Sequence, residues 1–547
     1  MPGSPAFFYC PYVLSFDMLQ DKILLIISLL LGVSMLSMLS EKFRISYPIF
    51  LVVAGLLISF VPAVPDIVLE PDLVFLIFLP PLLYEAAWHT PWKDFWRLKR
   101  PIALLGFGLV IVSACGVAWF ASYLLPEFTL ALGFLLGGII SPPDAVAATS
   151  IMHGLKVPKR TSIILEGESL VNDAASLIIF RFALAAILTG QFTLMKAETD
   201  FFVVGLMGIV VGLVIAHIVY AIHRFLPTTP SIDTAISLIT PYLMYIAAEH
   251  FHYSGVLAVV SGGLFLSFRS QDFFSYNSRL QTSNVWDTIV FMLNGVVFIL
   301  IGLQLKTIVN GLEDYSLAQA IGYGLFISLF IILIRIAWVF PGAYLPRLLS
   351  KKIRMTEPDP GWKNVFIIGW SGMRGVVSLA TALAIPLTLS DGITPFPHRN
   401  LILFISFVVI LVTLVFQGLS LPLLIRLLKI EVVENEEAQE LAIRIRLAEA
   451  SLDYMNTNYQ ELADNDAYVR VRDRYARMID IANQRQANAE AATTAASFLP
   501  RYREMLLGII AVKRAALAKM RKDATYPEEL IRKREQELDL EEARLNR

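Results

Sequence analysis

The chain has 547 residues, of which 56% are hydrophobic and 17% are charged, and its mean hydropathy is +0.64. A soluble core of this size cannot bury so much apolar surface, so the composition indicates a membrane protein with many spans. The net charge of −1 argues against a protein that binds nucleic acid through a basic face. Almost half of the charged residues follow Lys429, which predicts a membrane domain over 1–429 and a polar tail over 430–547.

About thirteen segments are long and apolar enough to cross a bilayer, whose hydrocarbon core requires about 20 residues of helix. The predicted spans are 18–40, 47–63, 70–88, 101–125, 129–152, 161–189, 200–223, 233–250, 254–268, 285–305, 317–347, 363–389 and 399–428. The first span follows Asp17, Asp21 and Lys22 without a small-residue cleavage pattern, so we interpret it as retained rather than as a signal peptide. The third contains Pro80 and Pro81, which predict a kink.

The loops between these spans alternate in charge. Basic residues concentrate in every second loop, and the opposite set of loops holds only Lys22, Lys196, Lys306 and Arg399. Because the cytoplasmic loops of membrane proteins are rich in Lys and Arg, this alternation predicts an external N-terminus, an odd number of spans and a cytoplasmic C-terminus.

Two of the spans contain residues that interrupt a helix within the membrane. The string Ser-Pro-Pro-Asp ends at Asp144 in span 129–152, and the string Gly-Met-Arg-Gly surrounds Arg374 in span 363–389. Such breaks are tolerated only where the freed backbone groups line a polar cavity. Breaks in two antiparallel spans are typical of an inverted-repeat transporter with a binding site near the midplane.

Span 161–189 has an unusual number of polar residues near its start. A charge inside a transmembrane helix costs a few kcal/mol and usually faces a cavity or a partner. Helical periodicity places Ser169 and Asp173 on one face, with Glu166 about one heptad below them. Glu168 and Asn172 lie on a neighbouring face, so this single helix presents two polar stripes.

Counting residues from the cytoplasmic ends places Asp144, Asp173, Arg335 and Arg374 at a similar depth, near the middle of the membrane, and Glu85 closer to the cytoplasm. Two acids and two bases near one plane, beside broken backbones, suit a cation site with a fixed internal counter-charge.

Each of these residues also has a purely structural interpretation. Asp144 would cap the second half of its broken helix, and Arg335 is expected to be the partner of a buried carboxylate. Arg374 is expected to balance the carbonyl ends exposed in its break. Glu166 is either an interfacial acid at a helix start or part of a cytoplasmic entry, and Arg181 receives no role.

These strings resemble those of the monovalent cation/proton antiporters, a family that includes bacterial and archaeal sodium/proton antiporters and animal and plant sodium/proton exchangers. The resemblance rests on Glu-Gly-Glu-Ser-Leu-Val-Asn-Asp at 166–173, Asp144 in its broken span, Gly-Met-Arg-Gly at 372–375 and Phe-Leu-Pro-Pro-Leu-Leu-Tyr-Glu at 78–85. It covers roughly residues 15–430 in the order typical of the family.

The resemblance implies an all-α polytopic fold of about thirteen transmembrane helices, with inverted repeats and two broken, crossing helices. It also implies a homodimer. The dimerisation part would be roughly 18–100 and 200–305, and the transporting core roughly 101–190 and 317–428. The tail, 430–547, is expected to be cytoplasmic and helical, and either regulatory, in contact with the second subunit, or merely solvated.

Carried over residue by residue, the resemblance implies that Asp173 and Asp144 hold the cation together with Ser169, while Glu85 assists through water. Asn172 would be the polar neighbour that marks exchangers of the electroneutral type.

The resemblance also implies that Glu168 and Arg335 form a buried ion pair that fastens span 161–189 to span 317–347. The chain departs from the family at Pro143, where many members have a threonine. The main-chain carbonyl of residue 143 stays available as a cation ligand, whereas the threonine hydroxyl is lost.

The sequence therefore predicts a secondary antiporter, not an enzyme, in the plasma (inner) membrane. A monovalent cation and H⁺ would compete for Asp173, with Na⁺ as the expected cation and Li⁺ or K⁺ as alternatives. No cofactor beyond the transported ions is expected, and no Gly-x-x-x-x-Gly-Lys-Ser/Thr loop for ATP is found. The rival interpretations are a cation channel, an antiporter-like exchanger of an organic or anionic substrate, and a membrane sensor whose tail is active.

Overall fold

The structure, a computed structural model, describes residues 11–43, 45–61, 71–152, 155, 157–190, 194–312, 315–357, 359–391, 393–430, 436–487, 489–522 and 528–546. Over these ranges the chain is helical, and the one β-type pairing among them is an isolated bridge between Thr388 and Pro395. The predicted all-α fold is therefore confirmed. The chain divides into two compact units, Met1–Val432 and Val433–Arg547, which are described separately below.

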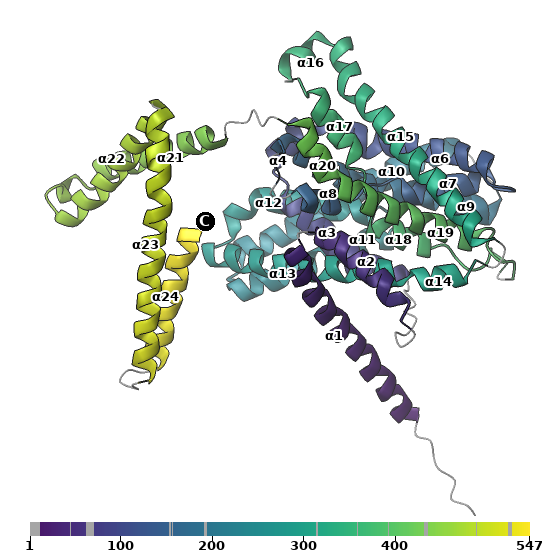
Figure 1. The fold of residues 1–547 in the computed structure, drawn as a ribbon, viewed down its shortest axis with the longest axis horizontal. Coiled ribbons are helices and arrows are strands. Elements are labelled where there is room, and N and C mark those ends of the chain that lie inside the picture. The colour runs from purple at the N-terminus through teal and green to yellow at the C-terminus, as the bar shows by residue number, and fades with distance from the viewer. Residues whose placement is uncertain are drawn as a thin grey trace, which may run out of the picture. The chain divides into compact units, whose positions relative to one another are not determined.

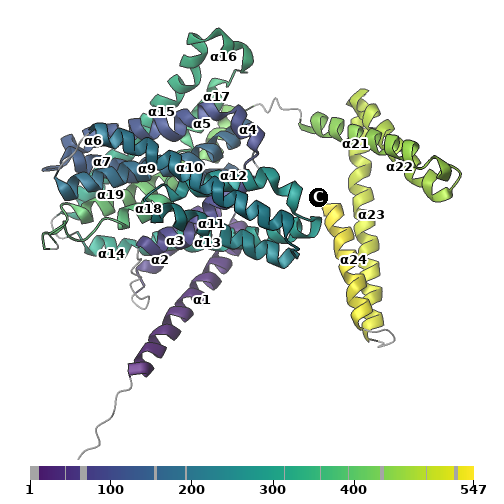
Figure 2. The same ribbon diagram turned by 180° about the vertical axis from the view of Figure 1, so that it is seen from behind.

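The first unit is a bundle of helices that run back and forth beside one another (Figures 1 and 2). Its helices are α1 (Pro11–Phe43), α2 (Tyr47–Ser59), α3 (Pro71–His89), α4 (Trp92–Arg97), α5 (Lys99–Ala103), α6 (Val110–Leu124), α7 (Leu130–Ile140), α8 (Ala145–Met152), α9 (Lys159–Thr189), α10 (Leu194–Phe225), α11 (Pro230–His250), α12 (Gly255–Phe273), α13 (Tyr276–Leu303), α14 (Leu305–Asn310), α15 (Leu317–Leu349), α16 (Lys351–Thr356), α17 (Trp362–Trp370), α18 (Val376–Leu383), α19 (Arg399–Leu411) and α20 (Gly418–Leu428).

Each predicted span coincides with a helix, or with helices in succession. By length and composition alone, nine helical stretches within the described residues qualify as membrane spans, among them α9, α10 and α15. The remaining predicted spans correspond to α2, α3, α12 and the pair α17 and α18. The stretch α2 is apolar but has only 13 residues. The chain is thus a polytopic membrane protein, and the number of crossings stays a prediction.

Large apolar side chains lie exposed along the outer faces of the long helices. On α10 the exposed set includes Leu206, Val210, Val214 and Ile218, spaced four residues apart as on one face of a helix. A soluble protein does not leave such a continuous stripe in contact with water, whereas lipid tails solvate it without cost. The exposed stripe therefore supports the membrane assignment independently of the hydropathy of the sequence.

Both predicted helix breaks are present, and they touch each other. Residues 141–144 separate α7 from α8, and residues 371–375 separate α17 from α18. The amide of Asp144 donates a hydrogen bond of 2.7 Å to the carbonyl of Met373, so the main chain of one break is bound to the main chain of the other. The prediction of two broken, crossing helices is therefore confirmed.

Two π-helical turns join helices of this unit. Leu104–Leu109 connects α5 to α6, and Val412–Gln417 connects α19 to α20. In the first turn the carbonyl of Leu104 accepts a hydrogen bond of 3.0 Å from the indole of Trp338 on α15. In the second turn the hydroxyl of Thr413 accepts one of 3.1 Å from the amide of Arg374. Each turn thus contacts an element that also surrounds the helix breaks.

The helices α2 and α13 approach so closely that their main chains touch at two glycines. A Cβ added to Gly55 would lie 2.4 Å from the carbonyl oxygen of Ile299, and one added to Gly302 would lie 2.3 Å from that of Val52. Both distances are far below van der Waals contact. Only residues without a side chain permit this packing.

The second unit consists of α21 (Glu436–Asn458), α22 (Asp466–Ala487), α23 (Ala489–Lys522) and α24 (Glu528–Asn546). The helices α21 and α22 pack on each other, and α23 pairs with α24. Arg514 on α23 bridges the carboxylates of Asp539 and Glu542 at 2.6 Å each, across exposed positions. The role that we predict for this tail stays a prediction.

Replacing Gly302 by valine is expected to destabilise the protein, because the added side chain would enter space that the main chain of α2 occupies. Overpacking of this kind costs about 1–3 kcal/mol, so the melting temperature of the purified variant in detergent should fall. Gly322 provides the control, since an added Cβ there would meet nothing within 4 Å. Equal melting temperatures for G302V and G322V would contradict the close approach of α2 and α13.

Candidate functional site

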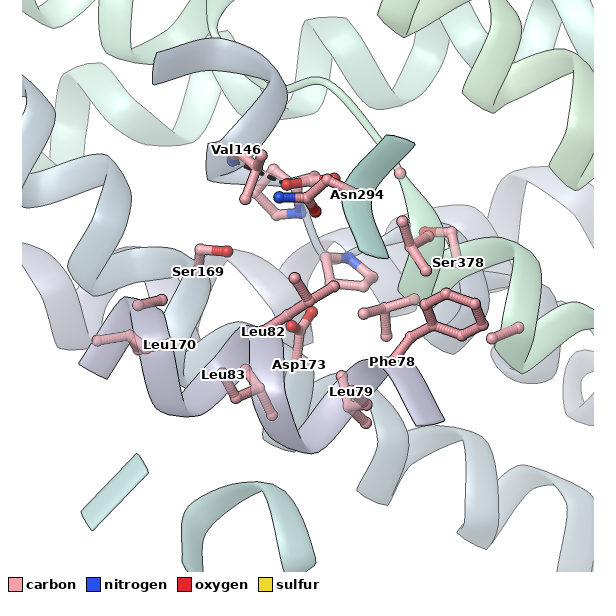
Figure 3. A pocket seen from close by; sticks show the side chains of 18 of the residues that line it. Phe78, Leu79, Leu82, Leu83, Val146, Ser169, Leu170, Asp173, Asn294 and Ser378 are labelled. Atoms are coloured by element: carbon pink, nitrogen blue, oxygen red, sulfur yellow. Dashed lines mark hydrogen bonds between the residues drawn. The ribbon is translucent and has the colours of Figure 1, made fainter. Parts of the chain in front are cut away.

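A cavity of about 70 Å³ lies against the break between α7 and α8. Its polar lining residues come from the break and from α9, α13 and α18, and they are Asp144, Ser169, Asp173, Asn294 and Ser378. The helix α3 contributes an apolar wall that includes Phe78, Leu79, Leu82 and Leu83 (Figure 3). Two carboxylates, two hydroxyls and one amide therefore share a small cavity that is otherwise apolar.

Asp144 begins the second half of its broken helix. Its carboxylate accepts a hydrogen bond of 2.8 Å from the amide of Val146, which caps the N-terminus of α8. The other carboxylate oxygen lies against Gly375 in the second break, so closely that a Cβ there would be 1.9 Å from it. Asp144 therefore caps α8, as its structural interpretation predicts, and also lines the cavity.

Asp173 and Ser169 lie one helical turn apart on α9, and both line the cavity, as their shared face predicts. Asp173 is buried, with 7% of its surface exposed. The hydroxyl of Ser169 accepts a hydrogen bond of 3.4 Å from the amide of Ala145 at the start of α8. The polar face of α9 thus meets the break that contains Asp144.

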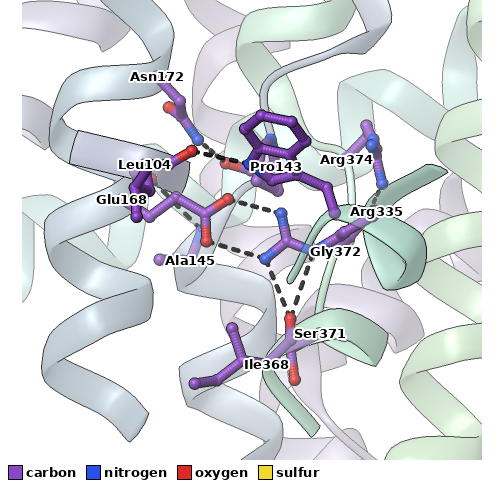
Figure 4. A network of polar contacts seen from close by, with 12 residues as sticks. Leu104, Pro143, Ala145, Glu168, Asn172, Arg335, Ile368, Ser371, Gly372 and Arg374 are labelled. Atoms are coloured by element: carbon purple, nitrogen blue, oxygen red, sulfur yellow. Dashed lines mark hydrogen bonds and ion pairs between the residues drawn. The ribbon is translucent and has the colours of Figure 1, made fainter. Parts of the chain in front are cut away.

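Asn172 is fully buried on the neighbouring face of α9. Its amide nitrogen donates a hydrogen bond of 2.8 Å to the carbonyl of Pro143 (Figure 4). Its side-chain oxygen has no hydrogen-bond partner within the part of the chain that the structure describes. The Pro143 carbonyl, predicted as a ligand, is therefore occupied on one side by Asn172, and a carbonyl oxygen keeps a second lone pair for another contact.

Glu168 and Arg335 form a buried bidentate ion pair with N–O distances of 2.5 and 2.8 Å. Arg335 has no exposed surface, and its guanidinium also donates to the carbonyl of Ile368 near the end of α17 at 3.1 and 3.3 Å. These contacts join α9, α15 and α17 at one point, as Figure 4 shows. A pair with this geometry satisfies charges that would otherwise be expensive to bury.

Arg374 lies in the second break and is buried. Its Nε donates a hydrogen bond of 3.0 Å to the carbonyl of Ile140, the last residue of α7, and a terminal nitrogen donates to the carbonyl of Gly372. The C-terminus of a helix leaves carbonyls without partners and carries a partial negative charge. Arg374 from one broken helix therefore compensates the open end of the other.

Glu85 and Glu166 are not among the residues that line the cavity. Glu85 is partly buried on α3 and pairs with His89 one turn further on, at 3.1 Å. Arg181, to which the sequence assigns no role, pairs with Glu249 of α11 at 2.7 Å.

Sequence reasoning overlooked Asn294 and Ser378 as lining residues. Asn294 interrupts the apolar run over 289–303, and that isolation was a usable signal. Ser378 follows the second break, and its hydroxyl has no hydrogen-bond partner among the described residues. The apolar residues of α3 belong to the string at 78–85 that supports the family resemblance, but their apolar character alone did not predict a place in the cavity wall.

Replacing Glu168 by glutamine should strongly destabilise the protein, because the guanidinium of Arg335 would stay buried without a counter-charge. Removing one partner of a buried pair costs about 3–5 kcal/mol. The control is Asp272→Asn, which breaks an exposed pair with Arg269 at 3.1 Å and should cost at most about 1 kcal/mol. Thermal unfolding of the purified variants tests this prediction. Similar losses of stability in both variants would show that the buried pair contributes no more to stability than the exposed one.

Comparison with known proteins agrees with this architecture. The family described as "Sodium/hydrogen exchanger, transmembrane" matches residues 25–427. A solved structure of the sodium proton antiporter MjNhaP1 from Methanocaldococcus jannaschii superposes with a TM-score of 0.58 at 21% identity, over 74% of this chain and 98% of that one. The similarity to MjNhaP1 supports the fold.

Several relatives are similar in sequence. An antiporter of Bacillus pumilus, named for sodium, potassium, lithium and rubidium/H⁺, is 35% identical over 70% of this chain and 58% of its own length. The protein of the same name from Bacillus subtilis is 35% identical over 74% of this chain and 61% of its own length. The chain therefore spans about three fifths of these two relatives.

A third relative is similar over nearly its whole length. An uncharacterized Na⁺/H⁺ exchanger of Mycobacterium bovis is 31% identical over 97% of both chains. The relatives are named as antiporters or exchangers, which supports the prediction of a transporter rather than an enzyme. Together with the broken, crossing helices, these matches show that the chain belongs to the sodium/hydrogen exchanger family.

Proposed function

We propose that this chain exchanges a monovalent cation for H⁺ across the membrane by secondary active transport, with Asp173 as the group for which the two ions compete. The observation that carries this proposal is the small cavity in which Asp144 and Asp173 lie together against two helix breaks. Na⁺ is the first candidate, and the names of the two Bacillus relatives add Li⁺ and K⁺.

The mechanism follows from the cost of burying charge. A cation or a proton neutralises the carboxylate of Asp173, so the loaded site can pass through a low-dielectric environment, whereas the empty site would carry its charge into that environment. Movement of the empty site is therefore disfavoured, and the movements of cation and proton become coupled. No chemical energy source is required for this exchange.

We assign the cation ligands to the carboxylates of Asp173 and Asp144, the hydroxyl of Ser169 and the main-chain carbonyl of Pro143. Hard oxygen ligands of this kind suit Na⁺ and Li⁺. Glu85 would act through water, and Glu166 would belong to the cytoplasmic entry.

Three further residues hold the site without contacting the ion in this proposal. Glu168 and Arg335 cancel each other's charge and fasten α9 to α15, and Arg374 compensates the open end of α7. Asn172 is neutral, so one proton at Asp173 replaces one monovalent cation. We therefore propose an electroneutral exchange.

The proposal includes an arrangement in the plasma (inner) membrane with an external N-terminus and a cytoplasmic C-terminus. It also includes a homodimer, in which roughly 18–100 and 200–305 form the contact and roughly 101–190 and 317–428 move. The basic residues of alternate loops support the orientation.

The central test is proton movement in proteoliposomes when Na⁺, Li⁺ or K⁺ is added. The wild type should move protons in response, and D173N should not, because an amide cannot exchange a proton with the cation. A wild type without cation-driven proton movement, or a fully active D173N, would refute the proposal. Flux that is insensitive to an opposing proton gradient would indicate a channel. Clamping the potential at zero should leave the rate of an electroneutral exchanger unchanged, whereas it would raise the rate of an electrogenic one.

Replacing Gly375 by alanine should also impair exchange, because the added methyl group would overlap the carboxylate of Asp144. A displacement of about 1 Å in a binding group can lower the rate roughly tenfold or more. Gly369 on α17 is the matched control, since its added Cβ would meet no atom closer than 3.5 Å. In the same flux assay G369A should keep wild-type activity. Wild-type activity in G375A as well would show that the function of Asp144 does not depend on its close approach to Gly375.

A further inference from the structure

The cavity has two unlike walls. Asp144, Ser169, Asp173 and Ser378, on one side, lie on the helices that carry the breaks and on α9. The rest of the lining comes from α3 and α13, and the residues that α3 contributes to it are apolar. Asn294 of α13 is the one polar side chain among the lining residues from these two helices.

Asn294 is buried, with 4% of its surface exposed, in a helix whose following residues are apolar. Burying an amide in such surroundings costs free energy unless the amide finds polar partners. The ring of Tyr47 on α2 packs beside Phe291 and Phe298, one turn to either side of Asn294. Asn294 also lines the same cavity as Asp144. Asn294 therefore extends the polar surroundings of Asp144 onto α13.

Figure 3 shows the amide of Asn294 directed toward the start of α8, where Val146 is labelled, from the side opposite to Ser169. A ligand between these residues would be contacted from both walls. The amide oxygen of asparagine is a neutral, hard ligand of the kind that alkali and alkaline-earth cations accept.

The size of the cavity makes such a ligand useful. The cavity is small, at about 70 Å³, and most of the side chains that line it are apolar. A cation cannot keep its full hydration shell there, so oxygens of the wall must replace most of the lost water. The apolar side chains of α3 cannot supply them, which leaves Asn294 as the source of oxygen on that side.

We propose that the side-chain oxygen of Asn294 is a ligand of the transported cation and sets the apparent affinity of the site. The inference rests on the proposed function. Asn294 lies in span 285–305, in the part that we assign to dimerisation, so the ligand comes from a different part of the fold than Asp144 and Asp173.

The test measures the KM for Na⁺ and the maximal rate of exchange in proteoliposomes. N294A should raise KM about tenfold with little change in maximal rate, as expected for one lost polar contact. N294D keeps an oxygen in the same place and loses the amide donor, so its KM should stay within about twofold of the wild type or fall. A KM for N294A within twofold of wild type would overturn the inference.

Two comparisons separate this inference from others. Asn284 is an exposed asparagine on the same helix, so N284A should leave KM unchanged. If N294D raises KM as much as N294A does, Asn294 acts as a hydrogen-bond donor that holds its neighbours, and the ligand role is wrong. If the wild type exchanges normally and N294A has the same KM, only this inference is refuted. If the wild type itself is inactive, the proposed function is refuted.

Discussion

The hydrogen bond from the amide of Asp144 to the carbonyl of Met373 binds the two helix breaks to each other, and the candidate site depends on this contact. Each break alone would leave main-chain groups unpaired in a region without water, which costs several kcal/mol per group. Because the two breaks cross, groups in one break form hydrogen bonds with main-chain groups of the other. Arg374 and Gly375 extend the contact, one by binding the end of α7 and the other by leaving room for the Asp144 carboxylate.

The described charges in this region divide into two kinds. Glu168 and Arg335 are bound to each other in a bidentate pair, and Arg374 is bound to carbonyls, so these groups are held in fixed positions. Asp144 and Asp173 face the cavity instead. A site that must accept and release an ion needs carboxylates whose charge is not already cancelled by a fixed partner. Because the paired charges and the carboxylates at the cavity are separate groups, an ion can enter or leave the site without breaking the contacts that hold the helices together.

Much of this could be predicted from the sequence, because helical periodicity and the proline and glycine strings are local signals. They are enough to place Ser169 and Asp173 on one face and to locate both breaks. The partner of Glu168 was not a local signal, since Arg335 lies far away in the chain, and only the family resemblance suggested it. Asn294 was overlooked because its place in the cavity depends on how α13 packs, which periodicity does not encode.

The two π-helical turns have a consequence for the tolerance of this fold to changes in length. A π turn holds one residue more than the α-helix that would replace it, and it leaves an acceptor free for another element. Trp338 uses the main-chain carbonyl of Leu104 in this way, and in the second turn the Arg374 amide binds the side-chain hydroxyl of Thr413. Deleting one residue from either turn would restore a regular α-helix and leave the helix beyond it in nearly the same orientation, but it would shift the residues that make these contacts. The extra residue in each turn is therefore tied to the contacts that the turn makes with Trp338 or Arg374.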